Sequence, residues 1–183
     1  MYKYLLDYKL KEETVKECMI IWAKNVGHNI ELDKWEHIWQ TNYKLTLSVS
    51  YKENLYKMVY RWHIPPARLA KMFPNLPPNC WKCNFPQGIY FHMWWTCPWA
   101  QKFWRNIKNW ILCITKQNIK FDPEIFLLSM IDQKIEKKYQ CLILHIITAA
   151  RITYAQNWKM STNPPEEMVI KKIHECAEMD SLT

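Results

Sequence analysis

Residues 80–97 read CWKCNFPQGIYFHMWWTC, a stretch in which three cysteines and one histidine stand at C-x2-C-x8-H-x4-C spacing. Structural zinc sites take four such ligands in a tetrahedron, and a C-x2-C pair brings two sulfurs to one ion from a tight turn. The stretch therefore predicts a closed zinc site, with no open position for catalysis, whose ligands are Cys80, Cys83, His92 and Cys97. The alternative is that these four residues are unrelated members of a cysteine-containing chain.

The residues around the four candidate ligands fit a turn followed by a helix. Residues 84–88 include an asparagine, a proline and Gly88, one of only two glycines in the chain, and are typical of a backbone reversal. Pro98, directly after Cys97, favours the first position of a helix. Cys97 would then lie at a helix N-terminus, where the helix dipole favours a thiolate.

The composition favours helices over sheets. The chain has 183 residues, of which 49% are apolar and 15% aromatic, so it can bury a core and is not disordered. Two glycines leave few positions for the left-handed turns that hairpins use. We therefore expect a mostly helical fold with a small CCHC zinc knuckle between helices. The segments 1–60, 61–120 and 121–183 are expected to form one or two compact units.

The cysteines outside the knuckle favour a reducing compartment. Seven cysteines are an odd number, and the N-terminal residues MYKY do not begin an apolar signal core, so a secreted disulfide protein is disfavoured. We expect an intracellular protein, in the cytoplasm, the nucleus or both. The apolar run 141–150 is too short to span a bilayer, so we expect a buried helix and no membrane contact.

The positive charge is concentrated in the middle of the chain. Residues 61–120 carry nine basic residues and no acidic one, whereas the segments on either side are nearly balanced. This block therefore accounts for the net charge of +8. A basic block with interleaved aromatic residues is typical of a nucleic-acid binder, and a solvated basic surface without a partner is the alternative.

The clearest amphipathic helix follows the knuckle. Its apolar stripe consists of Ala100, Phe103, Trp104, Ile107, Ile111 and Ile114, and the polar side carries Lys102 and Arg105 with Lys108 at the flank. The candidate nucleic-acid contacts are therefore Arg61, Arg68, Lys71, Lys82, Lys102, Arg105 and Lys108 for phosphates, and Trp81, Trp94 and Trp95 for bases. For the three tryptophans, packing around the metal is the alternative.

Capping residues, prolines and first-turn acids predict where other helices begin. The predicted starts are Thr14, Asp33, Ser50, Asp122, and Thr162 or Asn163. The helix from Ser50 is expected to run through Trp62 and to end before Pro65 and Pro66. A long helix is expected over 134–158, with His145 as a neutral, hydrogen-bonded core residue.

Several of these strings resemble the C-terminal zinc-binding region of LINE-type (non-LTR) retrotransposon reverse-transcriptase proteins. They are residues 53–57 (ENLYK), 61–62 (RW), 80–83 (CWKC), 92–97 (HMWWTC), 148–151 (TAAR) and 157–159 (NWK). The resemblance implies that the cysteines and histidine of residues 80–97 bind zinc. It also implies that the module holds nucleic acid, RNA rather than DNA, beside a polymerase domain. Residues 63–65 depart from the family pattern, and they remove no ligand.

No catalytic motif accompanies the zinc ligands. The chain has no Gly-rich phosphate loop, no G-x-S-x-G elbow, no H-E-x-x-H and no Asp-Asp pair of a polymerase palm. We therefore expect no enzyme activity and a fragment of the longer polymerase. The leading hypothesis is a zinc-stabilised nucleic-acid-binding module. The alternative is a structural or protein-docking appendage of the polymerase that makes no nucleic-acid contact.

Overall fold

Helix α7 (Lys137–Gln156) is the centre of the fold, because α3 (Val49–Val59), α5 (Pro98–Thr115) and α8 (Glu166–Ser181) all pack against it. The computed structural model describes residues 16–45, 48–131 and 134–181, and every regular element in these ranges is helical. The remaining elements are a helix over residues 16–26, α2 (Leu32–Leu45), α4 (Pro66–Met72), the π-helical turn η1 (His92–Thr96) and α6 (Pro123–Leu128). The expectation of a mostly helical fold with the knuckle between helices is confirmed.

Most of the apolar run 141–150 on α7 is buried, as predicted, but Cys141 and Leu142 at its start are not. Its residues from Ile143 to Ala150 are buried except His145, which is half-buried, whereas Leu142 is exposed. The Nδ1 atom of His145 lies 3.4 Å from Cys176 Sγ on α8, so this histidine is hydrogen-bonded. No helix in the described ranges has the length and apolar character needed to cross a membrane.

The apolar stripe on α5 packs as predicted over most of its length. Ala100, Phe103, Trp104, Ile107 and Ile111 are all buried. Ile114 was expected in the same stripe and is 58% exposed. The helix ends at Thr115, whose buried hydroxyl donates to the Ile111 carbonyl, so Thr115 takes the last buried position instead.

One predicted helix start is correct, and three are displaced. The Asp122 carboxylate accepts a hydrogen bond from the Glu124 N–H at the start of α6. Helix α2 begins at Leu32, before Asp33, and α3 begins at Val49, before Ser50. The predicted start at Thr14 lies outside the described residues. Local capping patterns therefore located helices to within one or two residues here.

Helix α8 begins later in the chain than predicted, because a contact with α5 occupies one of the predicted capping side chains. It begins at Glu166, so neither Thr162 nor Asn163 caps it. The Asn163 side chain instead donates its Nδ2–H to the Trp99 carbonyl, 2.8 Å away on α5. A contact across the fold therefore occupies the side chain that the sequence pattern assigned to a local cap.

Helix α3 ends earlier than predicted. Arg61 has a φ of 53°, in the left-handed region that usually favours glycine. The N–H of Trp62 donates to the Lys57 carbonyl, and the N–H of Arg61 donates to the Met58 carbonyl. These two bonds form a Schellman motif, which ends the helix and leaves Trp62 outside it, 69% exposed.

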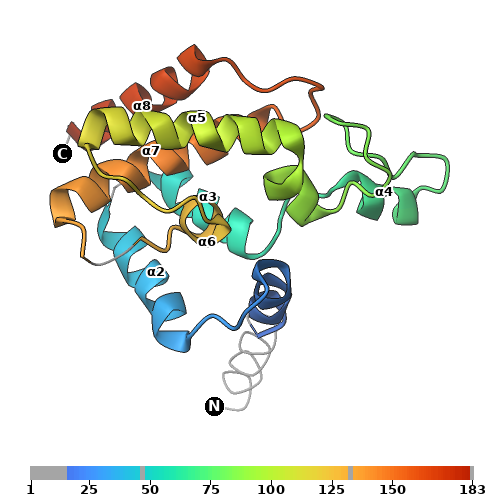
Figure 1. The fold of residues 1–183 in the computed structure, drawn as a ribbon, viewed down its shortest axis with the longest axis horizontal. Coiled ribbons are helices and arrows are strands. Elements are labelled where there is room, and N and C mark those ends of the chain that lie inside the picture. The colour runs from blue at the N-terminus through green and yellow to red at the C-terminus, as the bar shows by residue number, and fades with distance from the viewer. Residues whose placement is uncertain (1–15, 46–47, 132–133, 182–183) are drawn as a thin grey trace.

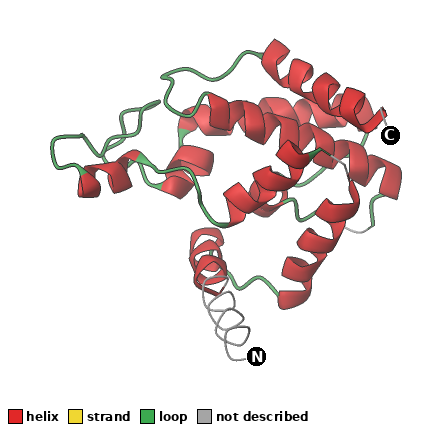
Figure 2. Ribbon diagram, turned by 180° about the vertical axis from the view of Figure 1, so that it is seen from behind, coloured by secondary structure: helices red, strands yellow, loops and turns green. Residues whose placement is uncertain are grey.

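The segment with α4 and residues 73–89 extends to one side of the helices as an arm (Figure 1). Figure 2 shows from behind that this arm is mainly loop, with the short α4 along one edge. Residues 80–97 lead from the arm through η1 into α5. The knuckle thus joins an extended arm to the packed helices.

Candidate metal centre

The structure brings the four predicted ligands together. Cys80, Cys83, His92 and Cys97 place one ligand atom each within 4.8 Å of one another, and they form a group that could hold a metal ion. The Sγ atoms of Cys80 and Cys97 are 3.8 Å apart, and Cys83 Sγ lies 3.2 Å from His92 Nε2. Cys80, His92 and Cys97 are buried, whereas Cys83 is partly exposed.

A tight turn presents the first two cysteines. The Cys80 carbonyl accepts from the Asn84 N–H, and the Cys80 N–H donates to the Phe85 carbonyl, both at 2.9 Å. Asn84 has a φ of 59°, a conformation that asparagine tolerates better than most residues. The left-handed position of the knuckle is therefore Asn84, not Gly88.

Gly88 is needed for another reason, because the surrounding atoms lie too close to its backbone to leave room for a side chain. A Cβ atom at this position would lie 2.9 Å from the Cys80 nitrogen and 3.0 Å from Pro66 Cγ. The Gly88 N–H donates to the Pro78 carbonyl, and its own carbonyl accepts from the Ala67 N–H. The absence of a side chain at position 88 therefore allows the start of α4 to pack close to Cys80, the first candidate ligand.

We expect Gly88→Ala to destabilise the knuckle by about 1–3 kcal/mol, because the added methyl overlaps backbone atoms. The matched control is Gln87→Ala, since Gln87 is the exposed neighbour. Chemical denaturation of both variants, together with their zinc affinities, checks this. Equal stability of the two variants would show that the contact at Gly88 relaxes freely.

A π-helical turn aligns the last two ligands. In an α-helix, residues five apart point about 140° away from each other, so His92 and Cys97 could not share an ion. Here the Cys97 N–H donates to the His92 carbonyl at 2.9 Å, the i→i+5 bond of a π-helix. Cys97 is then the residue that precedes Pro98 at the start of α5, as predicted.

The imidazole of His92 is oriented by its neighbours. Its Nδ1 lies 3.1 Å from Thr96 Oγ1, and its ring stacks on Phe85 with centroids 4.9 Å apart. With the proton on Nδ1 donated to Thr96, the Nε2 lone pair faces the three sulfurs. Metal-bound histidines usually have such a partner on the second nitrogen. Thr96 was not identified from the sequence, although its i,i+4 spacing from His92 on a helix could have indicated it.

The surroundings favour one thiolate in the Cys80–Cys97 pair. The hydrogen bond with Cys97 lowers the pKa of the Cys80 thiol, and the backbone N–H groups of Cys83 and Lys82 lower it further. The same bond raises the pKa of Cys97, because the pair shares one proton, while N–H groups at the start of α5 oppose this effect. A cation at the centre would replace that shared proton.

Lys82 does not fit its predicted role as a phosphate contact. It is only 7% exposed, and its Nζ donates to the carbonyls of Met160 and Thr162, at 2.9 and 2.7 Å. Burial lowers the pKa of Lys82, and the nearby thiols of Cys97 and Cys80 oppose this shift. The ammonium thus connects the knuckle to the segment between α7 and α8.

Two of the three predicted stacking residues are buried. Trp94 is 0% exposed and packs on Tyr154 and Trp158 with ring centroids 5.2 Å away, and Trp95 packs on Phe121 at 4.8 Å. Trp81 is half-buried, with its ring edge-on to Trp158. For Trp94 and Trp95 the stacking prediction is therefore wrong, and packing explains their presence.

The predicted basic contacts fall into two classes. The Arg61 guanidinium lies 4.5 Å from the Tyr90 ring centroid, and burial lowers its pKa, so this side chain is part of the packing. Five others reach the surface to differing degrees. Arg68 and Lys71 are exposed on α4, Lys102 and Arg105 are exposed on α5, and Lys108 is half-exposed there.

Compared with models of known protein families, the chain matches none.

Proposed function

We propose that this chain is a non-catalytic, zinc-stabilised module that binds nucleic acid, RNA rather than DNA. The observation that carries the proposal is the exposed basic side of α5. Lys102 and Arg105 are exposed one turn apart, and no acidic residue between positions 61 and 120 opposes them. Such a surface attracts phosphates and releases their counterions on binding.

Zinc is the metal that best suits the cluster. A tetrahedral site with Zn–S bonds of ~2.3 Å has sulfur–sulfur edges of about 3.8 Å. The Sγ atoms of Cys80 and Cys97 have this separation of 3.8 Å. With all four ligands from the protein, the ion has no open position and its role is structural. Free thiols also fit a reducing, intracellular location.

The zinc would fix the basic helix relative to the rest of the fold. Cys97 is the N-cap residue of α5, and Lys82 links the same knuckle to the end of α7. A bound ion therefore fixes the position of the first turn of α5. Lys102 lies just over one turn along the helix from Cys97. This arrangement is consistent with the resemblance to the C-terminal zinc-binding region of LINE-type reverse transcriptases, which implies the same ligand roles.

Changing Lys102, Arg105 and Lys108 together to glutamine is expected to weaken RNA binding and to flatten its salt dependence. Each lost phosphate contact on a single strand should reduce the log–log slope by roughly 0.7, so three contacts change it by about 2. Fluorescence anisotropy with labelled single-stranded RNA and DNA at several salt concentrations measures both quantities.

The matched control changes Lys24, Lys34 and Lys171, three exposed lysines outside the basic block, to glutamine. It lowers the net charge equally and should retain the slope of the parent. If the first triple variant binds RNA like the parent at every salt concentration, the basic side of α5 is not the site.

Docking on a polymerase domain is the second candidate function, and the arm favours it. Trp62, Met72, Phe73 and Phe85 are each more than half exposed near or within this arm. Exposed large apolar residues of this kind often mark protein contacts. Retained RNA binding in the α5 triple variant, or no RNA binding by the parent, would give this candidate the lead.

A further inference from the structure

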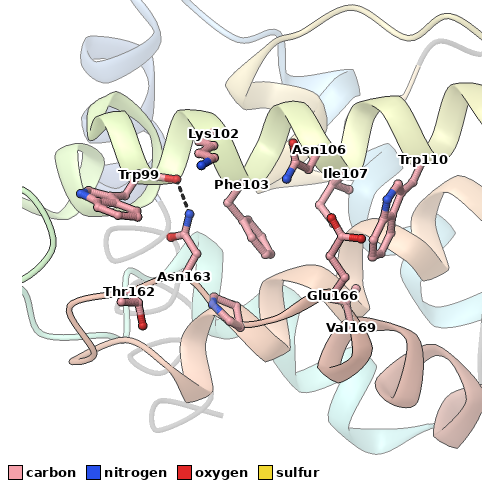
Figure 3. A pocket seen from close by; sticks show the side chains of 11 residues that line it. Trp99, Lys102, Phe103, Asn106, Ile107, Trp110, Thr162, Asn163, Glu166 and Val169 are labelled. Carbon is pink, nitrogen blue, oxygen red and sulfur yellow. Dashed lines mark hydrogen bonds between the residues drawn. The ribbon is translucent and has the colours of Figure 1, made fainter.

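A cavity of about 190 Å³ lies between α5 and the start of α8 (Figure 3). This is far more than the ~10–15 Å³ that a single water needs. One wall consists of α5 residues spaced three and four apart from Trp99 to Trp110, and the other consists of residues 162–164 with Glu166 and Val169. The hydrogen bond from Asn163 to the Trp99 carbonyl holds the two walls together at one end.

The cavity has an apolar floor and two aromatic ends. Phe103, Ile107 and Val169 are buried and form the floor. Trp99 is 39% exposed, and Trp110 is half-buried. The two tryptophans are eleven residues apart on one helix, which is about 16 Å. A planar ligand can therefore lie against one of them and cannot be sandwiched by both.

The polar groups differ between the two ends. Figure 3 shows Glu166 reaching toward α5 between Phe103 and Trp110, with Asn106 nearby, whereas Lys102 lies toward the Trp99 end. No ion pair involves Glu166 in the part of the chain that the structure describes. Lys102 and Asn106 are about 6 Å apart along the helix axis, and Glu166 lies on the Asn106 side of Lys102 (Figure 3).

We infer that this cavity binds one unpaired guanine base of a single-stranded nucleic acid. The Watson–Crick edge of guanine presents a ring N–H beside an exocyclic amino group, two adjacent donors that match one carboxylate. Adenine and cytosine present their amino group beside an acceptor, and uracil presents a single N–H between acceptors. Glu166 therefore selects guanine over the other three bases.

The rest of the nucleotide fits the remaining groups. The base lies over the apolar floor beside Trp110, since aromatic side chains are the usual stacking partners of unpaired bases. Its phosphate faces Lys102, at the other end and on the basic side of α5. A free phosphate alone is a poor occupant, because Glu166 repels it and the floor is apolar. This inference rests on the proposed nucleic-acid-binding function and assigns it a base preference.

The test uses a labelled oligouridylate with one central guanosine and a second oligomer with inosine in its place. Inosine lacks only the exocyclic amino group. The parent should bind the guanosine oligomer at least about fivefold more tightly, because a good bidentate contact is worth about 1–3 kcal/mol. Glu166→Ala should bind both oligomers equally. Glu167→Ala, the matched control in the same first turn, should discriminate like the parent.

The outcomes separate this inference from the function on which it rests. If the parent binds both oligomers equally and with a steep salt dependence, the nucleic-acid function stands and the guanine site is excluded. If Glu166→Ala binds the guanosine oligomer more tightly than the inosine oligomer by the same factor as the parent, Glu166 does not recognise guanine and the inference fails. If the parent binds neither oligomer at any salt concentration, the proposed function itself is wrong.

Discussion

Replacing Cys80 and Cys97 with serine is expected to abolish zinc binding and to unfold the knuckle. A serine hydroxyl stays protonated at neutral pH and is a poor zinc ligand, so the variant loses two of four donors. Structural zinc sites contribute about 10–16 kcal/mol of apparent binding energy in zinc-finger peptides, so the loss is large. Metal analysis should find about one equivalent of zinc in the parent and almost none in the variant.

The control for this experiment replaces two cysteines that lie outside the cluster. Cys113 is exposed and Cys18 is half-buried, and neither belongs to the four-residue group. Cys18→Ser with Cys113→Ser should keep one equivalent of zinc. Full zinc content in the Cys80/Cys97 variant would contradict the ligand assignment.

Hydrogen exchange should locate the effect of metal removal. Chelation of the parent should increase exchange in residues 80–97, which contain the turn, η1 and the four candidate ligands. The α7–α8 contact includes none of the four candidate ligands and should remain protected. Uniform loss of protection would mean that the whole fold depends on the ion.

The cluster of four candidate ligands could be predicted because these residues stand at a characteristic short-range spacing. Cys80 and Cys83 belong to one turn, and Pro98 indicates directly where α5 begins. The buried stripe of α5 follows from the helical period alone. In each case the residues that determine the feature are neighbours in sequence.

The roles of the basic and aromatic residues could not be predicted in the same way. A count of charged residues assumes that Lys82 is exposed. Its ammonium instead donates to carbonyls of residues 157–162, which lie far along the chain. Trp94 and Trp95 both belong to the π-helical turn, and an α-helical or extended pattern does not predict that both are buried. Arg61 ends α3 in a conformation that its residue type rarely adopts.

The cavity beside α8 was missed for a related reason. Trp99, Lys102 and Trp110 occur in the basic block, but Glu166 lies in the C-terminal segment. Only the packing of α5 and α8 against α7 brings these residues to one place. A site built from two segments that are far apart in the sequence leaves no local pattern.

Leu144→Lys is expected to destabilise the fold by about 3–5 kcal/mol. Leu144 is 4% exposed on α7, so the substitution buries an ammonium group. The matched control is Leu142→Lys on the same helix, where the side chain is 37% exposed. Leucine and lysine have similar helix propensities, so the control should change stability by less than about 0.5 kcal/mol.

Urea unfolding of both variants with zinc present separates burial from helix propensity. A large loss in Leu144→Lys with little change in Leu142→Lys would follow from the orientation of α7, which turns residue 144 away from solvent. The two positions are two residues apart, about 200° around the helix, so they face nearly opposite directions. Equal effects at both positions would mean that this turn of α7 is oriented differently, and the core that supports α5 and α8 would have to be reassigned.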